Sequence, residues 1–288
     1  MAYKLEEKLS KVLYIDLTEQ KYEITDRLDL FDKYLGGAGV AAKLLEEECP
    51  KGADPLEPDN PIILAVGPLT TLYPCMSKTV AMFKSPLTGN LGESHSGGRS
   101  ALAIRLAGYG AIVIKGAADK PIYLSIYNDK VEFKDASILW GMRTTYSVGR
   151  VLREVEPGSG RRTIMRIGLA GERLVRFSNV AVETFRHFGR QGLGAVMGSK
   201  RLKALVIGGT GEVAIANLRE YIKAYKEIYD LVTKTPAMMK YRDYGTAVNV
   251  LALNTIGALP TRNLRATRFE YAENICGGKL AETLLSRR

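Results

Sequence analysis

Short hydrophobic runs separated by glycine, proline and polar residues fill the first two hundred residues of the chain. Runs of β-branched and aromatic side chains bounded by turn residues are typical of strands. VLYIDLT and KYEIT flank a turn at Glu19–Gln20, so we expect them to form an N-terminal hairpin. We expect further strands at PIILAVGP, TVAMFK, AIVIKG, PIYLSIY, KVEFKD, TIMRIGLAG, RLVRFSNVAV and ALVIGG.

Helical patterns interrupt these strands and then replace them. We expect helices at 26–35, 39–48 and 146–155, and after Gly209 at 216–234, 246–256 and 278–285. The apolar positions of the 216–234 segment share one face: Leu218, Tyr221, Ile222, Tyr225, Ile228 and Tyr229. The pattern predicts an α+β fold, with a β-rich domain over 1–210 and the beginning of a helical domain over 211–288. Because the helical pattern is unfinished, we expect an exposed apolar face there.

One quasi-repeat stands out within the β-rich part. Gly98-Arg99 leads through SALAIRLAGYG into AIVIKG, and Gly189-Arg190 leads through QGLGAVMGSKRLK into ALVIGG. Each copy is a Gly-Arg turn, a short helix of small residues and a hydrophobic strand. Two such units predict a domain with pseudo-twofold symmetry.

Each Gly-Arg turn admits two interpretations. A helix N-terminus with free N–H groups attracts anions, and an arginine fork binds phosphate or carboxylate, so the turns predict two equivalent anion sites. Alternatively, the small residues only let the helices pack closely on strands, and Arg99 and Arg190 form ion pairs with a carboxylate such as Glu93. We expect Glu172 to cap a turn, Tyr109 to pack at a helix end and Trp140 to anchor a core or interface.

Composition narrows the class of protein. The 288 residues are 46% hydrophobic and carry a formal net charge of +10, without a nucleic-acid-binding motif, a secretory signal or a membrane span. We therefore expect a cytoplasmic protein that binds neither nucleic acid nor membrane. A phosphate- or nucleic-acid-binding protein is an alternative that rests on charge alone. Cys49, Cys75 and Cys276 form no CxxC pair, which argues against a disulfide framework and a metal site within this chain.

Several blocks resemble, in order and spacing, the N-terminal domain of aldehyde ferredoxin oxidoreductases. They are YLGGAGVAAKLL, ILAVGPLT, FKSPLTGN, SGGRSALAIRLAGYGAIVIKGAADKPIYL, IGLAGERLVRFSNVAV and GRQGLGAVMGSKRLKALVIGG. YGTAVNV and NTIGALPTRN are similar to the opening of the helical second domain of this family. The resemblance covers essentially the whole chain. It implies a β-rich base of two pseudo-twofold-related sheets that carries a bis-pterin cofactor of tungsten or molybdenum, with one pterin phosphate for each Gly-Arg unit.

The resemblance also implies which residues contact the pterins. A basic residue before the KSPLTG strand end is Lys78, where an arginine is common in the family. The loop before the first repeat helix supplies His95, Ser96, Gly97 and Gly98, and the loop before the second supplies Arg186, His187, Gly189 and Arg190. His95 stands where well-known members carry asparagine, and His187 and Phe188 stand where small residues are common. For both histidines, a surface-loop role without a pterin contact is the alternative.

The resemblance implies an enzyme that oxidises aldehydes to carboxylic acids and passes electrons to ferredoxin. The family's [4Fe–4S] cysteines and acid/base residues follow the stretch that matches LLSRR, so we expect them in a missing C-terminal part. The sequence assigns no catalytic residue and no metal ligand to this chain. The alternatives are an incomplete pterin-binding or scaffold fragment that needs C-terminal domains or a partner chain, and a subfamily acting on another carbonyl or acyl-CoA substrate. A homodimer is also compatible with the resemblance.

Overall fold

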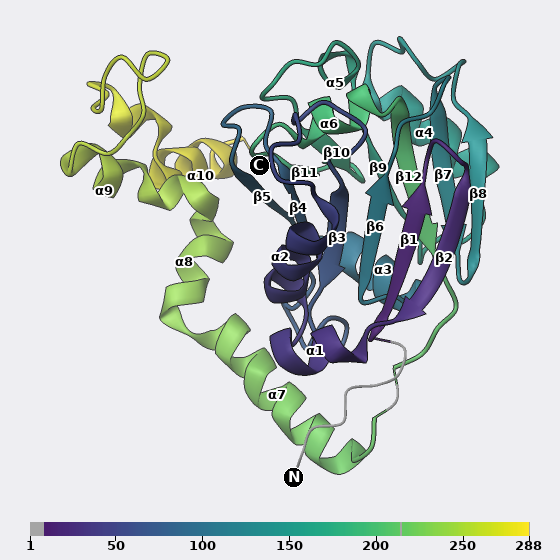
Figure 1. Cartoon of the computed structure of the whole chain (residues 1–288). Helices are drawn as coiled ribbons and strands as arrows, with labels where there is room; N and C mark the ends of the chain where they lie inside the picture. Colours follow the sequence, from purple (N-terminus) through teal and green to yellow (C-terminus); the bar gives the residue numbers. More distant parts are fainter. Residues whose placement is uncertain (1–8, 214, 288) are drawn as a thin grey trace. The chain divides into compact units, whose positions relative to one another are not determined.

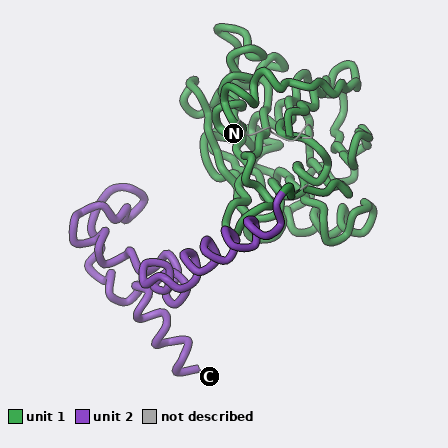
Figure 2. Tube along the Cα trace, turned by 90° about the horizontal axis from the view of Figure 1, so that it is seen from below, with its two compact units in different colours: residues 1–216 green, residues 217–288 purple. Residues whose placement is uncertain are grey.

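A computed structural model describes residues 9–213 and 215–287 of the chain. It divides into two compact units, residues 1–216 and residues 217–288 (Figure 2). Within the described residues, no helix is both long and apolar enough to cross a membrane. The domain boundary near residue 210 stays a prediction.

The first unit contains two six-stranded sheets (Figure 1). The first sheet, in the order β2-β1-β6-β3-β4-β5, consists of β1 (Lys11–Asp16), β2 (Lys21–Asp26), β3 (Ile62–Val66), β4 (Thr79–Lys84), β5 (Leu91–Ser96) and β6 (Ala111–Lys115). The second sheet, in the order β11-β10-β9-β12-β7-β8, consists of β7 (Ile122–Tyr127), β8 (Lys130–Asp135), β9 (Thr163–Arg166), β10 (Val180–Val182), β11 (Arg186–Phe188) and β12 (Leu202–Gly208). The expected α+β class is confirmed.

Both sheets have the same connectivity. Each begins with an antiparallel hairpin, β1-β2 or β7-β8. The last strand of each half, β6 or β12, pairs in parallel with the first. On its other side it pairs antiparallel with β3 or β9, which continues into β4-β5 or β10-β11. The repeat noticed in the sequence is therefore the end of a longer repeat that spans all twelve strands.

The helices of the first unit also repeat. They are α1 (Leu28–Tyr34), α2 (Gly37–Glu48), α3 (Ser100–Ala107), α4 (Thr145–Val155), α5 (Leu169–Glu172) and α6 (Leu193–Ser199). Helices α2 and α4 occupy the same connection in the two halves, and each packs on the sheet of its own half. Helices α3 and α6 each precede the returning strand, as the quasi-repeat predicted. The short helix α5 has no counterpart among the described elements of the first half.

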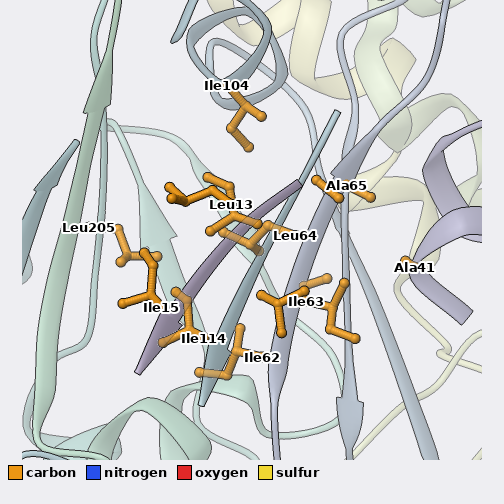
Figure 3. Close-up of a cluster of buried hydrophobic side chains, with 14 of the residues drawn as sticks. Leu13, Ile15, Ala41, Ile62, Ile63, Leu64, Ala65, Ile104, Ile114 and Leu205 are labelled. Atoms are coloured by element: carbon orange, nitrogen blue, oxygen red, sulfur yellow. The ribbon is translucent and has the colours of Figure 1, made fainter. Parts of the chain in front are cut away.

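The hydrophobic core lies between the sheets and beneath the covering helices. Along β12, Leu205 faces the main core and Val206 faces the smaller core under α4, which explains why this strand is hydrophobic throughout. Figure 3 shows Ile15 of β1 directed toward Leu205, whereas Ala41 of α2 lies beyond the opposite face of the first sheet. Ile15, Ala41 and Leu205 are each at most 2% exposed.

The second unit is helical. It contains α7 (Leu218–Lys234), α8 (Pro236–Tyr244), η1 (Gly245–Asn249), α9 (Val250–Thr255), η2 (Ala272–Ile275) and α10 (Gly277–Leu285), where η marks a 3-10 helix. The helices expected at 216–234 and 278–285 are confirmed. The one expected at 246–256 is divided between η1 and α9, and α8 was not predicted. Helix α7 buries none of its residues, and Leu218 and Ile222 are 61% and 55% exposed, so the expected exposed apolar face is present.

Two sequence expectations about local structure are wrong. RLVRFSNVAV forms a strand only at Val180–Val182, because the chain before it makes helix α5 and a turn. There the backbone approaches α6 so closely that a Cβ on Gly198 would lie 2.0 Å from the Gly171 carbonyl oxygen. The segments containing His95 and His187 are not loops, since His95 lies in β5 and His187 lies in β11.

Candidate cofactor site

The predicted contact residues meet where β5 and β11, the last strands of the two sheets, lie side by side (Figure 1). The backbone N–H of Arg190 donates to the Ser94 hydroxyl across 3.1 Å. The Ser85 hydroxyl donates to the Gln191 carbonyl oxygen across 2.8 Å. We call this region the seam; it comprises Lys78, Ser94 to Arg99 and Arg186 to Gln191. Sequence reasoning missed Ser85 and Ser94, because a lone serine carries no signal of a contact 96 or more residues away.

The strand registers bring Lys78 to the first Gly-Arg turn. Thr79 pairs with Ser96 at the end of the β4–β5 ladder, so the next step places Lys78 opposite Gly97. The buried Thr79 hydroxyl also donates to Ser100 at the start of α3, across 2.8 Å. This hydrogen bond fixes the turn between the strand and the helix.

Four glycines, three in the seam and Gly192 directly after it, fall into two groups. Gly98 and Gly192 have φ angles of 93° and 82°, in the left-handed region that favours glycine. Gly97 and Gly189 have no such positive φ, and a Cβ added to either would meet no atom within 4 Å. Neither backbone strain nor packing within the described chain requires glycine at these two positions. Open space beside the backbone suits a ligand that approaches it closely.

The seam has a basic rim. Lys78, Arg99, Arg186 and Arg190 are all exposed, and none forms an ion pair with another described residue. Arg99 and Arg190 were alternatively expected to form an ion pair with a carboxylate such as Glu93, and neither of them pairs with Glu93. Glu93 instead accepts a 2.6 Å hydrogen bond from Nε2 of His95.

The two helix starts at the seam differ, so the expected equivalence of the two turns is wrong in detail. Arg99 directly precedes α3, whereas α6 begins at Leu193, three residues after Arg190. The amide of Gly194 in α6 already donates to the Ser178 carbonyl oxygen across 3.1 Å. In the second turn, a backbone amide near the helix start is therefore already bonded to the protein. The first turn leads directly into its helix.

Buried charges outside the seam hold the fold. Glu172 accepts a 2.9 Å hydrogen bond from the Gly141 amide and pairs with Lys203, whose side chain is fully buried. Glu172 thus caps a turn, as expected.

Two aromatic residues singled out in the sequence are buried or packed on the core. Tyr109 is 2% exposed and donates to the Asn128 carbonyl oxygen, and this burial raises the pKa of its hydroxyl. Lys203 lies 5.9 Å from the ring centre of Trp140, which packs against the main core.

A cavity lies apart from the seam, and no metal-binding cluster occurs in the described part of the chain. Among the described residues, no cluster of three or more His, Cys, Asp or Glu side chains is placed to hold a metal ion. A cavity of about 530 Å³ lies at the C-terminal end of α3, at the end of that helix opposite Arg99. Its walls include Gly108, Asn128 and Thr210, and Asn128 and Thr210 are hydrogen-bonded to each other.

Comparison with known proteins decides the family. Residues 12–209 match the family model "Aldehyde ferredoxin oxidoreductase, N-terminal domain", and residues 223–288 match "Aldehyde ferredoxin oxidoreductase, domains 2 & 3". The chain belongs to the aldehyde ferredoxin oxidoreductase family. Tungsten-containing aldehyde ferredoxin oxidoreductases of Pyrococcus abyssi and Pyrococcus furiosus are 39% and 38% identical to it, over 96% and 90% of this chain.

Proteins named for other activities are also similar to this chain. The WOR-like subunit of the aliphatic sulfonate oxidoreductase of Pyrococcus furiosus is 33% identical over 92% of the chain. Among solved structures, the active site complex BamBC of benzoyl coenzyme A reductase, in complex with 1,5-dienoyl-CoA, aligns with a TM-score of 0.73 and 34% identity. That alignment covers 78% of this chain and 34% of the BamBC chain. The chain spans 46% and 43% of the lengths of the two tungsten-containing relatives.

Proposed function

We propose that the seam holds the two pterins of a tungsten or molybdenum cofactor. The chain then forms the cofactor-bearing part of an oxidoreductase that oxidises aldehydes to carboxylic acids and passes electrons to ferredoxin. The matched glycines carry this proposal: Gly97 and Gly189 end equivalent strands and face open space that the described chain does not use. The tungsten-containing relatives support the identity of the cofactor.

The residues of the seam fit such a group. Its phosphates are anionic, and the rim offers the cations of Lys78, Arg99, Arg186 and Arg190, none of which forms an ion pair with another described residue. Arginine binds phosphate through two parallel N–H groups, and lysine binds it as a point charge. We assign the phosphates to these side chains and the pterin edges to the backbone at Gly97 and Gly189.

His95 contributes a directed hydrogen-bonding group. Because the Glu93 carboxylate accepts from Nε2, that nitrogen carries a proton, and Nδ1 of the neutral ring is an acceptor for an N–H of the bound pterin. Glu93 is then a positioning residue that fixes the tautomer of His95. When bound, the metal and its pterins supply the redox chemistry, and the chain supplies binding and orientation.

We place the electron-transfer cluster and the acid/base groups outside this chain. The cysteines expected for a [4Fe–4S] cluster do not occur in it, and the relatives are more than twice as long. In this proposal, the cluster cysteines and the acid/base groups belong to further C-terminal domains or to a partner chain. The similarity to BamBC supports a second candidate substrate class, an acyl-CoA thioester.

The test is the cofactor content of the purified chain, produced in a host supplied with tungstate and molybdate. We expect pterin together with tungsten or molybdenum, and no iron. Lys78→Ala and Arg186→Ala should lower the pterin content several-fold, whereas Arg150→Ala, a surface arginine 80% exposed on α4, should not. Absence of pterin from the unaltered chain would contradict the proposal, as would equal losses in all three variants. Saturable binding of benzoyl-CoA to the loaded chain would favour the second substrate class over aldehydes.

A further inference from the structure

Strands β4 and β10 are preceded by chemically different residues, which lie opposite Gly97 and Gly189. Lys78 lies opposite Gly97, one step beyond the Thr79–Ser96 pair. In the second sheet Val180 pairs with Phe188, so the same step places Asn179 opposite Gly189. Because β4 and β10 are equivalent in the connectivity of the two sheets, Asn179 occupies in the second half the position of Lys78 in the first.

The backbone of Asn179 is held firmly, while its side chain is available. A Cβ on Gly194 would lie 2.6 Å from the Asn179 carbonyl oxygen, so the backbone there packs directly on α6. The preceding carbonyl, of Ser178, accepts the amide of Gly194 across 3.1 Å. The side chain is exposed, and its carboxamide has no hydrogen-bond partner among the described residues. The packed backbone fixes the position from which the side chain projects, and the carboxamide is available to bind a ligand.

We propose that Asn179 contacts the pterin at the second turn, as Lys78 contacts the pterin at the first. This inference rests on the proposed cofactor function of the seam. The ammonium group of Lys78 only donates and carries charge, which suits an anionic oxygen. The carboxamide of Asn179 both donates and accepts without charge, which suits the N–H and C=O groups along the edge of a pterin ring. The two pterins are therefore held by one ionic and one neutral contact at equivalent positions.

The experiment compares four variants of the whole chain with the unaltered chain. Asn179→Ala and Asn179→Asp alter the proposed contact, Lys78→Ala alters its counterpart, and Asn90→Ala is the matched control. Asn90 is an exposed asparagine in the β4–β5 turn. It directly precedes β5, whereas Gly97 follows the other end of that strand. The readout is pterin fluorescence per chain, measured after dialysis at low and at high salt and acid release. Thermal unfolding of each variant reports any loss of folding.

We expect Asn179→Ala to lower pterin retention about fivefold, the effect of one neutral hydrogen bond. Asn179→Asp should lower it further, because a carboxylate cannot donate and repels anions. The loss caused by Lys78→Ala should shrink at high salt, since salt screens the ionic contact, and the loss caused by Asn179→Ala should not.

Two results would overturn the inference in different ways. If Asn179→Ala retains as much pterin as Asn90→Ala while Lys78→Ala loses it, then Asn179 has no such role and the proposed function stands. If the unaltered chain carries no pterin, the proposed function fails and this inference fails with it. Unfolding of Asn179→Ala near the temperature of the unaltered chain shows that a loss of pterin reflects binding.

Discussion

The amide of Arg190 donates to the hydroxyl of Ser94 across 3.1 Å, and this hydrogen bond joins β5, an edge strand of one sheet, to the turn that follows β11, an edge strand of the other. Ser94 is 1% exposed, so the accepting hydroxyl is buried. An edge strand normally presents unpaired backbone groups. Here β5 and β11 lie against each other, and both Gly-Arg turns therefore lie at the seam.

Replacing Ser94 by alanine should weaken this junction. The Arg190 amide would lose its partner, so we expect the free energy of unfolding in urea to fall by about 1 kcal/mol. Pterin retention should fall as well, because the second turn would be less well fixed. Ser199→Ala is the control: its hydroxyl bonds the Val196 carbonyl oxygen within its own helix, and the stability should change by less than about 0.5 kcal/mol. Equal stability of both variants would show that the Ser94 bond contributes nothing.

Sequence pattern predicted the strands whose side chains build the core and missed those that build the seam. The strand β12 is buried at every position, and its hydrophobic run is unmistakable. By contrast, β5 turns only Gly92, Ser94 and Ser96 inward, so its alternation of exposed and buried residues carries no hydrophobic signal. An edge strand with small inward residues cannot be recognised by hydrophobicity, which is why His95 was expected in a loop.

Buried Lys200 should make stability depend on pH in the alkaline range. Its side chain is fully buried, and Nζ donates to the carbonyl oxygens of Pro58 and Gly116 across 2.8 and 3.0 Å. Burial lowers its pKa from 10.5 to about 8. Between these values the unfolded chain binds more protons than the folded chain, so the contribution of Lys200 to stability rises with pH from about 8 to 10.5. The full rise is at most about 3 kcal/mol.

The measurement for Lys200 is urea unfolding of the unaltered chain and of Lys200→Met at several pH values. Using the difference between the two proteins removes the titration of all other groups. We expect this difference to shift in favour of the unaltered chain as the pH rises above 8. A difference that stays constant from neutral pH to pH 10 would refute the assignment.

The buried pair of Glu172 and Lys203 should show a large single-variant cost and a partial recovery in the double variant. Lys203→Met leaves the Glu172 carboxylate, which is 5% exposed, with the Gly141 amide as its one remaining hydrogen-bond donor among the described residues, and such a charge costs about 3 to 5 kcal/mol. Lys203→Met combined with Glu172→Leu removes both charges and should recover part of that loss. The free energy of unfolding of the three proteins measures both effects.

A surface pair provides the comparison for this cycle. Arg150 and Glu154 lie 3.9 Å apart on α4, with side chains 80% and 71% exposed. Replacing either by alanine should change stability by less than about 1 kcal/mol. If Lys203→Met costs no more than these surface changes, the buried pair does not anchor α5 against the second sheet.

Only part of the candidate site could be predicted from the sequence. Glycine and arginine in matching contexts indicated two turns, and the turns do lie at one seam. The pairing of Glu93 with His95, rather than with an arginine, follows from strand alternation and needed the assignment of β5. Asn179 became visible only through the strand register, since nothing in the sequence near it repeats the KSPLTG context of the first half.

The most direct measurement of the central claim is the pterin content of Gly97→Val and Gly189→Val. A Cβ at either position would meet no atom within 4 Å beyond its immediate chain neighbours, so both variants should unfold at nearly the same temperature as the unaltered chain. If the seam holds the pterins, each valine occupies the space of the ligand, and pterin and tungsten or molybdenum should both be lost. Full cofactor content in both variants would show that the cofactor is bound elsewhere.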